Sequence, residues 1–139
     1  MTLPVGCVMG FNSTSARKSP TTPAFPPIRL EVRTTFEPTF TKSSGEQYLF
    51  YELRLQNYSE QPLTLTGLEV VDTTAEDHVV VNINKKHLGD MVQAIGVETL
   101  NNNQILPGQG IVVFFCLAFQ ANQQVPAQLR HRMLICTEN

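Results

Sequence analysis

The stretch that decides the fold is "QYLFYELRLQN", residues 47–57. The residues of one parity are apolar: Leu49, Tyr51, Leu53 and Leu55. Most residues between them are polar: Glu52, Arg54 and Gln56. Because successive side chains of a β-strand point to opposite faces, this alternation predicts a strand with one face in the core and the other in water.

Further strand signals lie on both sides of this stretch, separated by turn residues. Strands are predicted over residues 28–38, 63–72, 78–83, 111–120 and 128–136. Within 63–72 the apolar parity changes at Gly67, which predicts a β-bulge. The run "IVVFFCLAFQ" (111–120) is apolar on both parities, which predicts a central strand buried on both faces.

Turn chemistry and one helix complete the pattern. The segment "KSSGE" (42–46) predicts a turn, and the pair Pro107-Gly108 is typical of a type II β-turn. Residues 85–96, "KKHLGDMVQAIG", have apolar side chains at helical spacing: Leu88, Met91, Val92 and Ile95. This spacing predicts a short amphipathic helix despite Gly89.

These elements predict an all-β domain over residues 28–139, an antiparallel two-sheet sandwich with one short helix. A barrel is the alternative arrangement, and the lack of alternating long helices excludes a doubly wound α/β fold. Residues 1–27 combine several prolines with Ser and Thr and predict a flexible N-terminal segment.

Charge and hydropathy exclude several classes of partner. The net charge is −2, only 16% of the residues are charged, and no basic stripe is present, so no nucleic-acid partner is expected. The longest apolar run, residues 111–119, has about half the length of a membrane-spanning helix, so no transmembrane segment is expected. The N-terminus lacks the basic region of a clear signal peptide.

The cysteine pattern indicates neither a zinc site nor a disulfide framework. The three cysteines are an odd number without paired spacing. Cys116 lies within the apolar run and is predicted to be a buried small hydrophobe. A disulfide between Cys116 and Cys136 remains open, because sequence alone gives no geometry.

Three segments together resemble a domain of bacterial cell-envelope proteins. They are "YELRLQNYSEQPLTLTGLEVVD" (51–72), "ILPGQGIVVFF" (105–115) and "VPAQLRHRML" (125–134). Together they look like the immunoglobulin-like β-sandwich found ahead of lysostaphin-type zinc peptidase domains in secreted proteins. The resemblance covers roughly residues 45–136. It implies an immunoglobulin-like fold and an extracytoplasmic, periplasmic or secreted, location, but no reaction, because a fold alone does not carry function.

The peptidase half of such proteins is absent from this chain. Those enzymes hold zinc with an H-x-H pair and a separate histidine–aspartate pair, whereas His131 is followed by Arg132 and Met133. His78 and His87 are the other two histidines, so no such zinc set can be assembled. The sequence therefore predicts a protein that is not an enzyme and needs no cofactor.

His131 lies between two arginines on the predicted last strand. It shares its parity with the apolar residues of that strand, Leu129, Met133 and Ile135. A neutral imidazole on an inner face needs hydrogen-bond partners, and Asp72 is a candidate partner for His131 or for the arginines. We therefore expect His131 to have a structural role.

Arg130 and Arg132 have the opposite parity and should face water. On an antiparallel sheet they could form ion pairs with Glu52 or Glu69 on neighbouring strands. Exposed pairs of this kind contribute only ~0–1 kcal/mol each.

Metal binding is the main alternative interpretation. His131 and Met133 share a strand face, and His87 and Met91 are four residues apart on the predicted helix. Imidazole and thioether ligands suit copper(I), and Cys116 could join them. The alternative function is thus a small periplasmic, copper-type metal-handling protein. If the chain binds no metal, Met91 and Met133 are expected to pack in the core and His87 to be solvated.

Catalytic residues are less well supported. A pair formed by Cys116 and His131 on neighbouring strands would have an inert thiol, because an apolar environment raises the pKa of a cysteine. The carboxylates of "DTTAEDH" (72–78) belong to a polar connection between strands and are expected to be solvated.

Surface recognition is the leading interpretation. Tyr48, Phe50 and Tyr58 have the outward parity and are predicted to form an interaction surface, unless the N-terminal segment or the helix covers them. The expected function is that of a non-catalytic, exported module that binds a protein or a cell-envelope ligand. Asn57-Tyr58-Ser59 fits the N-glycosylation pattern, but Asn57 is expected to serve the turn instead.

Overall fold

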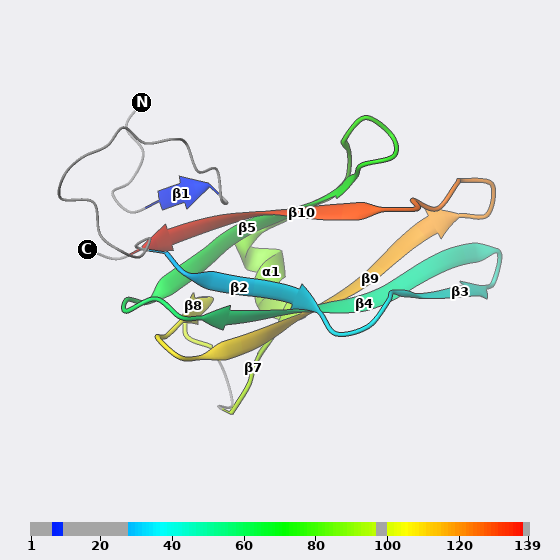
Figure 1. The fold of residues 1–139 in the computed structure, drawn as a ribbon. Helices are drawn as coiled ribbons and strands as arrows, with labels where there is room; N and C mark the ends of the chain where they lie inside the picture. Colours follow the sequence, from blue (N-terminus) through cyan, green and yellow to red (C-terminus); the bar gives the residue numbers. More distant parts are fainter. Residues whose placement is uncertain (1–6, 10–27, 97–99, 138–139) are drawn as a thin grey trace.

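A computed structural model of the chain shows two antiparallel β-sheets with one short helix (Figure 1). The structure describes residues 7–9, 28–96 and 100–137. Sheet A contains, in order, β1 (Cys7–Met9), β10 (Leu129–Thr137), β5 (Leu63–Asp72) and β6 (His78–Asn84), with β8 (Gln104–Ile105) also beside β5. Sheet B contains, in order, β2 (Leu30–Thr34), β4 (Glu46–Asn57), β9 (Gly110–Gln120) and β7 (Val92–Ala94), with β3 (Thr39–Ser43) also beside β4. The predicted all-β, two-sheet antiparallel sandwich is confirmed.

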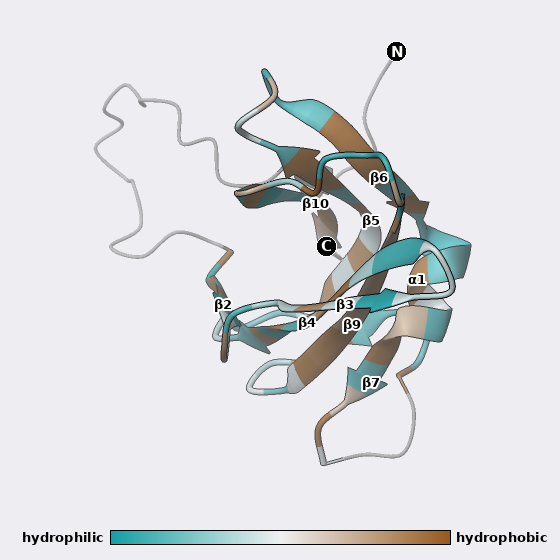
Figure 2. Cartoon of the chain, turned by 90° about the vertical axis from the view of Figure 1, so that its right-hand side faces the viewer, coloured by the Kyte–Doolittle hydropathy of each residue, from teal (hydrophilic) through white to brown (hydrophobic). Residues whose placement is uncertain are grey.

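The core lies between the inner faces of the two sheets, where hydrophobic segments of the strands face one another (Figure 2). Sheet B contributes the apolar parity of β4 and β9, including Leu53, Leu55, Val113 and Phe115. Sheet A contributes residues of β5 and β10, including Leu65, Leu68, Val70, Met133 and Ile135. The alternating burial along β4 is the pattern that residues 47–57 predict.

A β-bulge in β5 lets both of its halves face the core. Leu134 lies opposite Gly67 and Ile135 lies opposite Leu65, so Thr66 has no counterpart on β10. The extra residue shifts the parity, and the apolar residues on both sides of it are buried. The bulge predicted at Gly67 is therefore confirmed.

The helix is shorter than the sequence pattern predicts. Helix α1 spans Lys85–Met91, and the side chain of its N-cap Asn84 accepts a hydrogen bond from the backbone N–H of His87. Val92 already belongs to β7, where it pairs with Val113 of β9. Gly89 weakens the helix and a β-branched valine suits a strand, so sheet pairing wins after Met91.

The turns follow the local chemistry of their residues. The backbone N–H of Gln109 donates to the carbonyl of Leu106 at 2.9 Å, and Gly108 has φ 79°, as the predicted type II turn requires. Ser44 and Gly45 both have positive φ, which gives the two-residue hairpin between β3 and β4. The sequence pattern does not predict the short strands β3, β7 and β8.

Parts of the N-terminal and domain predictions lie outside the described residues. Within the predicted flexible segment 1–27, only β1 is described, and it pairs with the end of β10. The predicted first strand, 28–38, is observed as the shorter β2, Leu30–Thr34.

Asn57 is a fully buried polar residue at the end of β4. Its side-chain nitrogen donates to the carbonyls of Gln61 and Ile105 at 3.0 and 2.9 Å. Its side-chain oxygen accepts from the backbone N–H of Ser59 at 2.8 Å. Asn57 thus holds the turn after β4 and links it to β8, as the sequence predicts, and its buried amide is not placed to accept a glycan.

We predict that Asn57→Ala lowers the free energy of unfolding by about 3 kcal/mol, because it removes the hydrogen bonds of this side chain to the carbonyls of Ile105 and Gln61 and to the backbone N–H of Ser59. Urea denaturation checks this. Asn122→Ala, at an exposed loop position, is the matched control and should change the free energy by less than about 0.5 kcal/mol. Equal losses in both variants would contradict the role given to Asn57.

Candidate binding surface

His131 lies on the inner face of β10, half-buried against two aromatic rings of sheet B. Its Nε2 and the hydroxyl of Tyr51 share a hydrogen bond of 2.8 Å. The ring of Tyr51 stacks on that of Phe115, with centroids 4.6 Å apart. The position of His131 fits the predicted structural role, but its partner is Tyr51 and not Asp72.

Burial determines the charge of this pair. Desolvation lowers the pKa of His131 from 6.5 to about 4, so the imidazole is neutral at pH 7. Desolvation also raises the pKa of Tyr51, which keeps its hydroxyl protonated. A neutral imidazole and a protonated phenol can share one hydrogen bond without burying a charge, so the pair ties sheet A to sheet B at little desolvation cost.

Asp72 serves the turn between β5 and β6 instead. Its Oδ1 accepts hydrogen bonds from the backbone N–H and the hydroxyl of Thr74, at 2.9 and 2.5 Å. The suggestion that Asp72 pairs with His131 or with the arginines is therefore wrong. Asp72 bonds within its own turn, whereas His131 on the inner face of β10 meets Tyr51 of the opposite sheet.

The arginines beside His131 lie on the outer face of sheet A. Arg132 forms the predicted ion pair with Glu69, at 3.5 Å. Arg130 pairs with Asp77 at 2.6 Å, a partner that the sequence pattern does not single out. The predicted pairing with Glu52 is wrong, because Glu52 lies on sheet B and pairs with Arg54 at 3.7 Å.

The structure does not bring the candidate copper ligands together. Met133 is a core residue with 4% of its surface exposed, whereas His87 is exposed on α1 and Met91 is half-buried at the end of that helix. Cys116 and His131 lie on opposite faces, outer and inner, of their respective sheets. Within the described residues, no three His, Cys, Asp or Glu side chains are grouped so that they could hold a metal ion.

The outer face of β9 is more exposed than the sequence predicts. β9 is a central strand of sheet B, flanked by β4 and β7, but only its inner parity is fully buried. On the outer parity Phe114 is 47% exposed, and Cys116 and Ala118 are exposed too. The predicted burial of both faces holds as far as Val112, which is buried on the outer parity, but it is wrong from Phe114 onward and wrong for Cys116. Apolar residues on two parities predict two buried faces, yet the outer face is open at Phe114, Cys116 and Ala118.

The exposed thiol also decides the open question about the cysteines. Cys116 is free, so the bridge between Cys116 and Cys136 does not form. Cys136 is disulfide-bonded, and the backbone register of β1 and β10 places Cys7 directly opposite it.

Aromatic side chains gather on the outer face of sheet B around the outer parity of β4 and β9. Phe50 lies opposite Cys116, and Phe114 lies opposite Glu52. Phe36, which precedes β3, joins Phe50 and Phe114 in lining a shallow cavity of about 350 Å³. The ring of Tyr48 stacks on Phe50 with centroids 6.2 Å apart. We call Phe36, Tyr48, Phe50 and Phe114 the aromatic surface.

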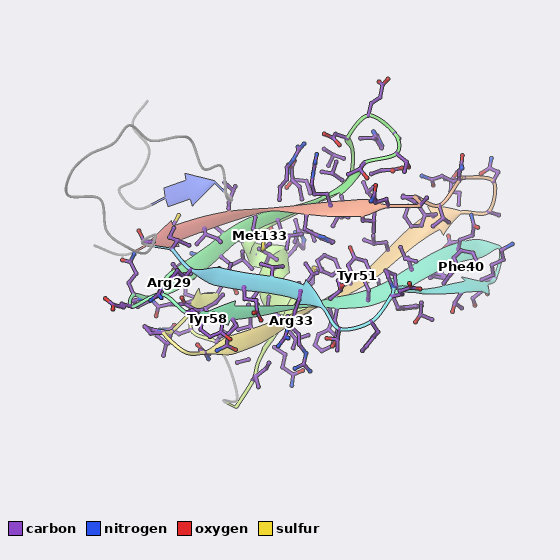
Figure 3. All side chains as sticks on the ribbon, in the orientation of Figure 1. Arg29, Arg33, Phe40, Tyr51, Tyr58 and Met133 are labelled. Carbon is purple, nitrogen blue, oxygen red and sulfur yellow. The ribbon has the colours of Figure 1, made fainter. Side chains whose placement is uncertain are left out.

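The predicted interaction residues divide into two places. Tyr48 and Phe50 belong to the aromatic surface, whereas Tyr58 follows the other end of β4 and lies far from Phe40 and the β3–β4 hairpin (Figure 3). Phe36 and Phe114 were not predicted as surface residues. The signal that could have found Phe114 is the same apolar outer parity of 111–120 that suggested burial.

The comparisons with known proteins add no relative. No protein-family model matches the sequence, and neither a curated protein nor a solved structure shows significant similarity to it. The resemblance to an envelope-associated immunoglobulin-like domain thus stays a prediction. In the part of the chain that the structure describes, no helix is both long enough and apolar enough to cross a membrane.

The lowered pKa of His131 predicts a pH-dependent stability. In the unfolded chain the imidazole binds a proton below pH ~6.5, whereas in the folded chain it does so only below about 4. The unfolded state therefore binds more protons between these values, and stability falls as the pH falls from about 6.5 to 4. We expect this histidine to account for a loss of about 2 kcal/mol, allowing for partial exposure of the ring.

Urea denaturation at pH 7 and pH 4.5 measures this loss. His131→Gln cannot titrate and should remove most of the histidine contribution, whereas His78→Gln, at an exposed position, should leave the pH dependence as in the wild type. The account of the Tyr51–His131 pair is wrong if both variants keep the full wild-type dependence.

Proposed function

We propose that the protein is a non-catalytic binding module whose aromatic surface docks a protein partner. The observation that carries the proposal is the exposure of three phenylalanines beside one another: Phe36 at 58%, Phe50 at 44% and Phe114 at 47%. Single exposed apolar residues are common, but a contiguous group on one sheet face is typical of interaction sites.

The composition of the surface favours a protein over a sugar. Phenylalanine offers a large, rigid apolar area but no hydrogen bond. Polar groups border the rings, namely Thr39 and Glu52, so an apolar centre has a polar rim, as at protein interfaces. The chain contains no tryptophan, and the one tyrosine of the surface uses its hydroxyl to donate to Glu46.

We further propose that the module acts outside the cytoplasm. Disulfides persist in oxidising compartments, so the disulfide at Cys136 supports an exported protein. The resemblance to envelope-associated sandwiches supports the same location.

Site-specific photo-cross-linking in the native cells tests the docking proposal. A photoreactive phenylalanine analogue is placed at Phe50 or Phe114, and as matched controls at Tyr58 or Leu134, which are similarly exposed but lie elsewhere. We expect one discrete adduct from positions 50 and 114 and none from the controls. Substituting Phe36→Ser should weaken the adduct, because it removes part of the same surface.

Equal cross-linking at all four positions, or none at positions 50 and 114, would contradict the proposal. An adduct with twice the mass of the chain would identify a second copy as the partner. Such a result would keep the docking surface but change the occupant.

Thiol counting tests the proposed location. In protein isolated from its native cells without reductant, we expect a maleimide to label one thiol per chain under denaturing conditions, that of Cys116, and three after reduction. Three labelled thiols before reduction would mean a reducing compartment and would overturn the proposed export.

A further inference from the structure

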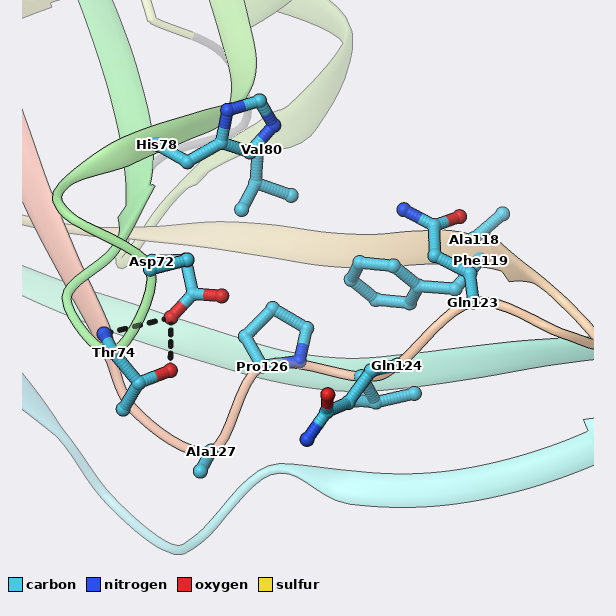
Figure 4. Close-up of a pocket in the computed structure, with 12 residues that line it drawn as sticks. Asp72, Thr74, His78, Val80, Ala118, Phe119, Gln123, Gln124, Pro126 and Ala127 are labelled. Atoms are coloured by element: carbon cyan, nitrogen blue, oxygen red, sulfur yellow. Dashed lines mark hydrogen bonds between the residues drawn. The ribbon is translucent and has the colours of Figure 1, made fainter.

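A cavity of about 470 Å³ opens at one end of the sandwich, between the β5–β6 turn and the connection from β9 to β10 (Figure 4). The polar side chains that line it come from both segments: Asp72, Thr74, His78, Gln123 and Gln124. Phe119 and Val80 supply apolar wall. The size is within the range of small-molecule sites.

The carboxylate of Asp72 is the strongest hydrogen-bond acceptor in this cavity. Asp72 is only 9% exposed, and its Oδ1 already accepts two hydrogen bonds from Thr74. Among the described residues no donor reaches Oδ2, which points away from Thr74 toward the cavity in Figure 4. Oδ2 thus has no hydrogen-bond donor from the described residues and is open to a charge-assisted hydrogen bond from a ligand N–H.

The oxygen remains reachable from outside. Within the described part of the chain, no completely buried side-chain oxygen or nitrogen lacks a hydrogen-bond partner. The unpaired Oδ2 of Asp72 therefore keeps some accessible surface, and the cavity is the space beside it. A ligand can contact this oxygen without any rearrangement of the turn.

The charge of the lining selects a cation. Among the described residues that line the cavity, Asp72 is the sole carboxylate, and none is a lysine or an arginine. The nearby Arg130 is held by Asp77 at 2.6 Å. A lone carboxylate with few other oxygen donors does not meet the six or more oxygen ligands that calcium prefers, whereas it suits an ammonium group.

We propose that this cavity binds a primary ammonium group carried on a short aliphatic chain. The ammonium donates to Oδ2 of Asp72, and its methylenes pack against the apolar wall at Val80 and Phe119. Gln123 and Gln124 line the other part of the cavity; the side-chain oxygen of Gln123 accepts from the backbone N–H of Gln120 at 3.1 Å, so its amide N–H₂ and the amide of Gln124 are left for the ligand. The site is independent of the proposed function, because none of the aromatic-surface residues lines it.

Two sources can present this chemistry, a free diamine and the lysine side chain of a peptide. Chemical-shift titration of the full chain, followed at the methyl groups of Val80, Ala118 and Ala127, tests both. The probes are 1,5-diaminopentane and Nα-acetyl-lysine amide, with 1-pentanol and Nα-acetyl-norleucine amide as neutral counterparts. Binding of the lysine amide alone would indicate a peptide, and tighter binding of the diamine a free amine.

We expect saturable shifts confined to the cavity with at least one amine, and none with the neutral counterparts. Asp72→Asn keeps an oxygen for Thr74 but removes the charge, and it should weaken binding about tenfold or more. Glu76→Gln removes an exposed carboxylate from the same turn and should leave the affinity unchanged.

A second pair of variants covers the case in which Asp72→Asn fails to fold. Ala127→Phe adds bulk at an exposed position that lines the cavity, whereas Ala121→Phe adds it at an exposed position outside the lining. The first should abolish the shifts at Val80 and the second should not.

The proposal is overturned if no saturable shift appears up to about 50 mM, well above the millimolar dissociation constant expected of so small a ligand. Equal shifts with the neutral counterparts, or wild-type affinity in folded Asp72→Asn, would overturn it as well.

Discussion

The antiparallel pairing of β4 with β9 is the constraint on which the rest of the structure depends. The register runs without interruption from Glu46 opposite Gln120 to Gln56 opposite Gly110. It places Tyr51 beside Phe115 on the inner face and Phe50 beside Cys116 on the outer face. A shift by one residue would exchange these faces, so one register determines both the core and the surface that we propose for binding.

Around this pair of strands, each buried polar group has a defined structural task. Asn57 satisfies two carbonyls and one N–H where β4 ends, and the Tyr51–His131 hydrogen bond joins the two sheets between their apolar residues. A neutral partner in each case avoids an uncompensated buried charge. Asp72 is different, because only one of its two carboxylate oxygens is used by its own turn. That difference leaves a hydrogen-bond acceptor open at the end cavity.

Local patterns predicted most of the framework. The alternation of 47–57, the parity change at Gly67 and the Pro107-Gly108 turn are properties of short segments, and each is found in the structure. The helix is too long in the prediction because the apolar spacing continues through Val92, whereas its partner on β9 lies twenty-one positions away in sequence. Non-local pairing of this kind cannot be derived from a window of neighbouring residues.

The candidate site residues are even harder to predict from short segments, because their environment is set by contacts that are distant in sequence. His131 has its partner on a strand of the other sheet, 80 positions earlier in the sequence, and Asp72, which closes a strand of the resembling pattern, is the wrong choice. The apolar run around Phe114, residues 111–119, predicts a core position for this residue. Only the layer order reveals that sheet B has an open outer face. Phe114, Cys116 and Ala118 on that face are therefore exposed.

The central claim is that two neighbouring phenylalanines of β9 have different roles: Phe115 stabilises the core, and Phe114 belongs to the surface that we propose for binding. The free energies of unfolding of Phe114→Ser and Phe115→Ser, measured side by side, test it most directly. Phe115 is 3% exposed, so its loss should cost about 3–5 kcal/mol, whereas Phe114 keeps about half of its surface in water and its loss should cost less than about half as much. A comparable loss in both variants would mean that the outer face belongs to a buried core, and would contradict the account.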